Sequence, residues 1–199
     1  GRAAAGTWTL RVEGGSGEVR MSSWALHVEP QAPRRDDPQG SPSRLLPTVV
    51  HAAGLHGAFF TSDLVLFNPD PVEPADVDLS FLRSARPSPD AARVSLTVPA
   101  RSTRVLADVV GNVFRTTGWG SVHVSAPAGV VVASRTETTS AGGGSYGLLV
   151  PSVSADGALG EGDSPAWLVP VSRAGTSRVN VGLAEVTGSP ASVELVLRD

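Results

Sequence analysis

Short runs of alternating apolar and polar residues, each ended by glycine or proline, limit most strongly how this chain can fold. Typical runs are "TWTLRVE" at 7–13, "ADVDLSF" at 75–81 and "ASVELVL" at 191–197. Alternation with a period of two predicts β-strands that are buried on one face. Turn stretches such as "NPDPVEP" and "SAGGG" separate runs of this kind from residue 48 onward. Many short strands with such punctuation predict an all-β fold of β-sandwich architecture.

One segment departs from the strand pattern. Residues 106–114, "LADVVGNVF", have a helical pattern of apolar residues, but the segment is short and Gly111 lowers its helix propensity. It predicts a turn or two of helix between strands. Trp167, within the run "AWLVPV", is expected to lie in a strand and in the core.

The order of the runs predicts four parts. Residues 1–28 hold two strand-like runs around the turn "GGSG", which predicts a β-hairpin. Residues 29–46 are rich in proline and poor in apolar residues, which predicts an extended linker. Residues 47–150 are expected to form one sandwich, and 151–199 the opening strands of a second, incomplete unit. The chain is therefore expected to be a piece of a longer protein.

An internal similarity relates the two expected sandwich units. The stretch that begins "SDLVLFNPD" at Ser62 is similar to "VNVGLAEVT" at Val179, and the similarity aligns Asp63 with Asn180. A short polar side chain at the beginning of a strand can bond to neighbouring backbone groups. We therefore interpret Asp63 and Asn180 as a structural pair of strand-start residues, one in each unit.

Composition excludes several classes of function. The chain has no cysteine, which excludes disulfides, thiolate metal ligands and cysteine nucleophiles. A net charge of −3 gives no basic surface for nucleic acid. No apolar run approaches the roughly 20 residues of a membrane-spanning helix. No cofactor is expected.

Serine motifs in the chain do not predict an enzyme. The stretch "GGSYG" has the spacing of a nucleophile elbow centred on Ser145, but that motif requires a helix after the serine. The residues that follow, "LLVPSV", predict a strand instead, so we expect a glycine-rich loop and no catalytic residue.

Two groups of possible metal ligands also lack the required pattern. His51 and His56 lie close in sequence, but no further pair or carboxylate completes a zinc site. A calcium site would have to draw on the acidic residues of one turn and strand, without the spacing of a known loop. These residues are Asp70, Glu73, Asp76 and Asp78. No metal site is therefore expected.

Trp119 is the one candidate for ligand contact. It lies between glycines in "TTGWGSVHV", and an aromatic ring on a loop can stack on a sugar or a peptide. The competing interpretation is a tryptophan that caps one end of a sandwich.

Two resemblances give the chain a context. The residues "GTWTLRVEGGSGEVRMSSWALHVEP" at 6–30 contain "GTWTL" and "SWAL". Over residues 6–28 they resemble the C-terminal end of the P/Homo B domain that follows subtilisin-like proteases. The stretches "TSDLVLFNP" at 61–69, 75–81 and "SYGL" at 145–148 resemble an uncharacterised repeat of bacterial secreted proteins. That resemblance implies an immunoglobulin-like fold and export, and carries over no functional residues; the serine in "TSD" interrupts the repeat's usual Thr-Asp pair.

These observations together predict a non-catalytic, extracellular structural or accessory β-sandwich module of a secreted bacterial protein. Its partners are expected to be proteins, either copies of itself or adjacent domains of the same polypeptide. Because the expected hairpin and the incomplete unit expose strand edges, copies could join by strand addition into a fibre. The alternative is a glycan- or protein-binding module appended to a secreted subtilisin-like protease, with Trp119 as the stacking residue.

Overall fold

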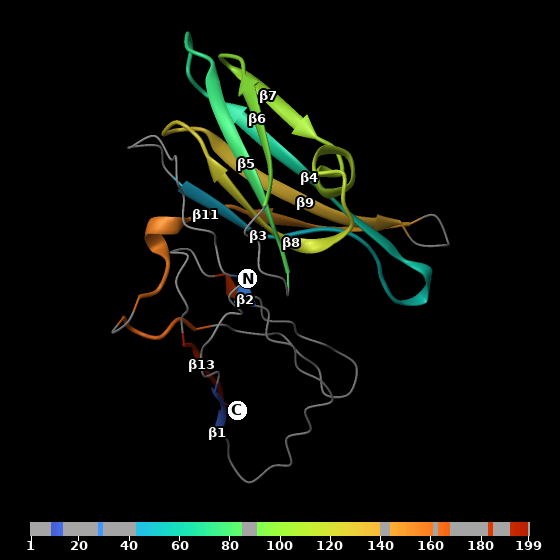
Figure 1. Ribbon diagram of the computed structural model, residues 1–199, viewed down its shortest axis with the longest axis vertical. Helices are drawn as coiled ribbons and strands as arrows, with labels where there is room; N and C mark the ends of the chain where they lie inside the picture. Colours follow the sequence, from blue (N-terminus) through green and yellow to red (C-terminus); the bar gives the residue numbers. More distant parts are fainter. Residues whose placement is uncertain are drawn as a thin grey trace.

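The protein has an all-β, sandwich-type fold, as the sequence predicts. The computed structural model describes residues 9–13, 28–29, 43–84, 91–139, 144–160, 163–167, 183–184 and 192–198. Nine of the described strands form one continuous antiparallel sheet that folds over on itself (Figure 1). These strands are β3 (Ser43–Ala53), β4 (Phe59–Asn68), β5 (Ala75–Arg83), β6 (Ala92–Val98), β7 (Ser102–Leu106), β8 (Gly118–Ser125), β9 (Val131–Thr139), β10 (Ser145–Pro151) and β11 (Val153–Ser154).

The strand order explains how one sheet makes two layers. The main path runs β10-β9-β4-β3-β8-β5-β6, and β7 and β11 pair with β4 and β3 away from this path. Strand β4 pairs with β3 only over Phe59–Thr61, and farther along it pairs with β7 instead. The sheet therefore bends where β3 and β4 separate, with β4, β7, β9 and β10 on one side and β3, β8, β5 and β6 on the other.

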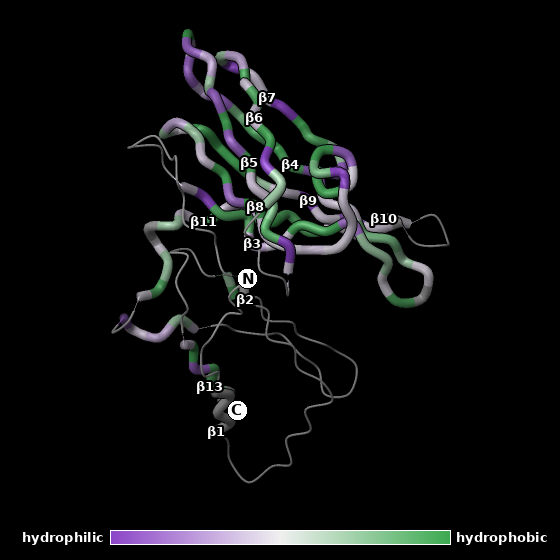
Figure 2. The backbone as a smooth tube through the Cα atoms, viewed as in Figure 1, coloured by the Kyte–Doolittle hydropathy of each residue, from purple (hydrophilic) through white to green (hydrophobic). Residues whose placement is uncertain are grey.

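The core lies between these two sets of strands. Buried residues from both sets of strands form the core. Strand β5 shows the alternation clearly: Val77, Leu79 and Phe81 are buried, whereas Asp76 and Asp78 are exposed. The two aspartates accept hydrogen bonds from Thr97 and Ser95 across the pair with β6. Each fully buried aliphatic side chain contributes roughly 1.5–3 kcal/mol. The green, hydrophobic stretches of the tube follow these strands (Figure 2).

Strand β3 begins at Ser43, inside the stretch expected to be a linker. Leu45 and Leu46 are buried, so they belong to the sandwich despite the neighbouring proline. The pairing of β3 with β8 shifts between Leu46 and Val49, and Pro47 is exposed within this irregularity. A proline has no N–H to donate and is tolerated at a bulge of this kind.

A short helical segment closes one end of the core, as the pattern of residues 106–114 predicts. It is a π-helix, η2 (Val109–Val113), with Val109 and Val110 buried. The ring of Phe114 stacks on Phe81 of β5 at a centroid distance of 5.4 Å. Two 3₁₀ turns, η1 (Leu55–Gly57) and η3 (Ala155–Gly157), follow β3 and β11.

The expected N-terminal hairpin and second unit lie largely outside the described residues. The described parts pair with each other: β1 (Thr9–Glu13) runs parallel to β13 (Glu194–Arg198), and β2 (Val28–Glu29) runs parallel to β12 (Leu183–Ala184). No described helix is long and apolar enough to cross a membrane.

Candidate functional site

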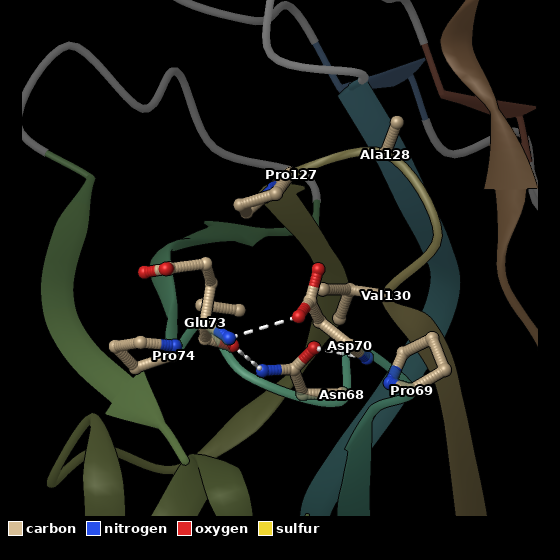
Figure 3. Close-up of a pocket in the computed structure, with 9 residues that line it drawn as sticks. Asn68, Pro69, Asp70, Glu73, Pro74, Pro127, Ala128 and Val130 are labelled. Carbon is tan, nitrogen blue, oxygen red and sulfur yellow. Dashed lines mark hydrogen bonds between the residues drawn. The ribbon is translucent and has the colours of Figure 1, made fainter. Parts of the chain in front are cut away.

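A cavity of about 360 Å³ lies at the end of the sandwich where β4 leads into β5. One wall is the loop from Asn68 to Ala75, and the other is the connection from β8 to β9, which includes Pro127, Ala128 and Val130. The carboxylate side chains of Asp70 and Glu73 stand on the first wall (Figure 3). The "NPDPVEP" stretch predicted a turn here, and the structure places that turn around an acidic hollow.

Asn68 holds this loop to the sheet. It is buried, with 2% of its surface exposed, and its Nδ2 donates to the carbonyl oxygens of Glu73, Val98 and Pro99 at 2.9, 3.1 and 3.3 Å. Its Oδ1 accepts from the Asp70 backbone N–H at 3.0 Å (Figure 3). One side chain thus bonds the loop at two places and fixes it against the end of β6.

Asp70 forms a second anchor within the loop. Its Oδ1 accepts from the backbone N–H groups of Val72 and Glu73, both at 2.8 Å. These bonds, the Glu73 bond first, lower the pKa of the Asp70 carboxyl below its ordinary value, although desolvation opposes them. The Asp70 carbonyl also accepts from the Arg101 backbone N–H at 2.9 Å.

The four acidic residues considered for calcium do not gather around the cavity. Asp70 and Glu73 line it, whereas Asp76 and Asp78 lie on β5 and bond to the hydroxyls of Thr97 and Ser95. Among the residues that the structure describes, no group of three or more metal-ligating side chains is present. The bonds of the Asp70 carboxylate to backbone N–H groups therefore stabilise the turn.

We predict that Asp70 makes stability depend on pH in the acid range. Because its pKa is lowered in the folded chain, its contribution is present above its ordinary pKa of 3.8 and is lost as pH falls through the lower folded value. Asp70→Ala should therefore be less stable than the wild type at neutral pH, and the two should converge in strong acid. Urea unfolding across this range measures the difference. Asp70→Asn, which does not titrate, is the control. A stability difference between the wild type and Asp70→Ala that stays the same at every pH contradicts the prediction.

A second polar cluster lies where β3, β4 and η2 meet. His51 Nδ1 and Asp108 Oδ2 are 2.7 Å apart, and the ring of His51 meets that of Phe59 edge-on at 4.9 Å. Asp108 has a left-handed backbone, with φ of 45°, and its Oδ1 accepts from the Gly111 backbone N–H at 3.2 Å. Gly111 has no space for a side chain because a Cβ there would overlap both Asp108 and His51.

Asp63 completes this cluster from the middle of β4. Its Oδ1 accepts from the Asp108 backbone N–H at 2.8 Å. The bond therefore ties β4 to the start of η2, 45 residues away in sequence. Asp63 is the fifth residue of β4, so the expectation that it begins the strand is wrong: the strand pairing extends back to Phe59. Asn180, which the sequence pairs with Asp63, lies outside the described residues.

We predict that Asp63→Ala lowers the melting temperature. The variant leaves the Asp108 N–H without its charged acceptor in a left-handed turn, which should cost about 1–3 kcal/mol. Asp76→Ala is the matched control, because it removes an exposed carboxylate that accepts a hydrogen bond from the Thr97 hydroxyl. Thermal unfolding followed by circular dichroism measures both variants. Equal melting curves for wild type and Asp63→Ala would remove this role.

The remaining candidate residues lie apart from one another. His123 is buried on β8 and bonds to the hydroxyl of Ser43, while His51 bonds to Asp108. Ser145 is the first residue of β10, so a strand follows it rather than a helix. The side chains of His27 and His56 are outside the described part of the chain.

Two tryptophans lie at the surface. Trp119 is in β8, where its side chain is 50% exposed and its carbonyl accepts from the Ser84 N–H at 2.9 Å. Trp167 is 72% exposed, and residues 163–167 form no strand, so the expectation that Trp167 lies in the core is wrong. The apolar residues around it suggested a buried strand, but burial also requires a packed layer over the side chain.

The comparisons with known proteins give no family. No protein-family model matches the chain, and no curated protein is significantly similar to it. A solved structure, "Crystal Structure of Thermotoga maritima 1070", matches 56% of this chain and 94% of its own length. The TM-score is 0.42 and the sequence identity 10%. A similarity of this size carries no argument about function.

Proposed function

We propose that this chain is a non-catalytic structural or accessory module of a secreted bacterial protein, and that it assembles with copies of itself or with sister units through the edge of its sheet. One observation carries the proposal. Strand β10 is at the end of the strand order, and three of its apolar side chains are largely exposed: Tyr146 (68%), Leu148 (67%) and Leu149 (65%).

An edge strand of this kind favours pairing with another chain. Among the described strands, β9 alone pairs with β10, and natural proteins usually protect such edges with charges, prolines or bulges. No charged residue lies between Glu137 and Asp156 in the sequence, and Pro151 stands only at the end of β10. Exposed apolar side chains add a favourable burial term when a second strand docks.

The polar groups of the described sandwich support a structural role. The buried Asn68 bonds to backbone carbonyls, and His51 and Asp63 both bond to Asp108. These bonds hold loops and turns in place. Labelling of Ser145 by a fluorophosphonate probe would be evidence for catalysis instead.

The extracellular location and the link to a protease are part of the same proposal. Their support is the resemblance of residues 6–28 to the end of a P/Homo B domain and that of residues 61–148 to a secreted repeat. Under this proposal, adhesion follows when units join edge to edge, and a filament forms only where a second edge of the sheet pairs as well.

Size-exclusion chromatography with light scattering over a range of concentrations tests the proposal. We expect the mass to rise above that of one 20.4 kDa chain as concentration increases. A single monomer mass at every concentration contradicts assembly between copies.

Glycan binding is the second candidate, because Trp119 offers a half-exposed ring on β8. A glycan array with the wild-type chain and Trp119→Ala tests it. Trp167→Ala, which removes another exposed tryptophan, is the matched control. Loss of binding in Trp119→Ala alone supports this function, and equal loss in both variants counts against it.

A further inference from the structure

The side chains of β10 divide between its two faces in a way that bears on what pairs with it. Residues opposite each other in neighbouring strands share a face. Tyr146, Leu148 and Val150 are opposite Thr138, Thr136 and Ser134 of β9. Ser134 in turn is opposite the buried Leu64 of β4, so this is the core-side face of the sheet.

The core-side face is covered only at one end of β10. Val150 is 7% exposed, whereas Tyr146 and Leu148 are 68% and 67% exposed. The strand registers show why: Tyr146 is in the same row as Thr138 of β9, Phe60 of β4 and Ala52 of β3, at the end of the sheet where β3 turns into β4. From Val150 toward Tyr146, therefore, no described strand of the opposing layer covers the apolar face of β10.

We propose that the occupant of this edge is a second copy of the chain, with β10 antiparallel to β10 about a two-fold axis at Leu148. This rests on the proposed function and names its partner. Two copies then share a continuous sheet, in which β9 and β10 of one copy are followed by β10 and β9 of the other.

The proposed register places compatible side chains opposite one another. Leu148 meets Leu148, and Tyr146 meets Val150 on the core-side face. On the other face Leu149 meets Gly147, which has no side chain and leaves room for it. Cross-strand apolar pairs of this kind stabilise antiparallel sheets.

The charged residues on the outer face are compatible with this register, although at this spacing salt screens most of their interaction between copies. On the outer face Arg135 is opposite Leu149 and Glu137 is opposite Gly147, and the two charged side chains form an ion pair at 2.7 Å. An axis at Leu148 puts Arg135 in the same row as Glu137 of the second copy, three strand spacings or about 14 Å away. An axis at Leu149 would align two arginines, and one at Gly147 two glutamates.

Cysteine cross-linking tests the inference directly, since the natural chain has no cysteine. In Leu148→Cys the two thiols face each other across the axis. Opposite Cα atoms in antiparallel strands are about 4.5–5.5 Å apart, within the range of a disulfide. We expect mild oxidation to give a disulfide-linked dimer, seen by non-reducing electrophoresis and mass spectrometry.

Tyr146→Cys is the matched control, because it is on the same face of β10 and equally exposed. In the proposed register this thiol is opposite Val150 of the second copy and far from the equivalent thiol of that copy, so it should not cross-link. Equal cross-linking of both variants indicates random collision and overturns the inference.

The light-scattering mass of each sample separates the two proposals. If Leu148→Cys has a mass above that of one chain but forms no disulfide between copies, the β10 pairing is overturned and the proposed function stands. A monomer overturns both. As a further readout, Leu148→Lys places two like charges on the axis and should raise the dimer dissociation constant roughly tenfold or more. Val105→Lys, at an exposed position of β7, should leave it unchanged.

Discussion

Gly120→Ala should destabilise the sandwich more than any other replacement of a hydrogen by a methyl group in the described strands. Gly120 lies in β8, between Val49 of β3 and Arg83 of β5. A Cβ there would overlap the backbone carbonyl oxygen of Leu82 and lie 3.0 Å from the Arg83 Cα. These are backbone atoms held by strand pairing, so they cannot rotate away as a side chain can.

We expect this overlap to cost about 3 kcal/mol or more in the free energy of unfolding. Urea unfolding of the purified variant measures the loss. Gly157→Ala is the control, because a Cβ at Gly157 meets nothing within 4 Å. Equal stability of the two variants would mean that β8 and β5 do not approach as closely as described.

Asn68→Ala should produce the second large effect. Its side chain satisfies the carbonyl oxygens of Glu73, Val98 and Pro99, and it is buried. A carbonyl left buried without a partner costs about 1–3 kcal/mol. The wall of the acidic cavity depends on the same bonds. The variant should therefore have a free energy of unfolding about 2–4 kcal/mol lower, and the loop that carries Asp70 should be released.

Asn112→Ala is the matched control, since Asn112 donates one exposed side-chain bond, to the Ala107 carbonyl at 3.1 Å. It should cost well under half as much as Asn68→Ala in the same urea experiment. Asn68→Asp provides a second check: it keeps the size of the side chain but removes the donors and places an acid among three carbonyls. If Asn68→Asp is as stable as the wild type, Asn68 does not anchor the loop.

Elements whose partners are close in sequence could be predicted well. The alternation of β5 set its bounds and its buried face, and the segment 106–114 correctly predicted a short helical connection. The beginning of β3 was missed because the proline-rich composition of residues 29–46 predicted a linker. Its burial depends on Leu45 and Leu46 pairing with β8, which is far away in sequence.

The polar clusters could be predicted only in part. The "NPD" sequence indicated a turn, but the bonds from Asn68 to Val98 and Pro99 cross to another strand. Asp63 was interpreted as a structural residue at the start of a strand. The hydrogen bond that its carboxylate accepts from the Asp108 N–H depends on where η2 begins, which the sequence around Asp63 does not contain. The exposure of β10 depends on how far the opposing layer extends, and local alternation does not contain that information.

Hydrogen exchange at two protein concentrations tests most directly whether units join through β10. We compare the backbone amides of residues 145–150 in β10 with those of β7, Ser102–Leu106, a strand that also lies off the middle of the sheet. Both are measured in dilute and in concentrated solution. Pairing between copies predicts slower exchange in β10 at high concentration and no change in β7. Exchange in β10 that is independent of concentration, or slowing confined to β7, would contradict it.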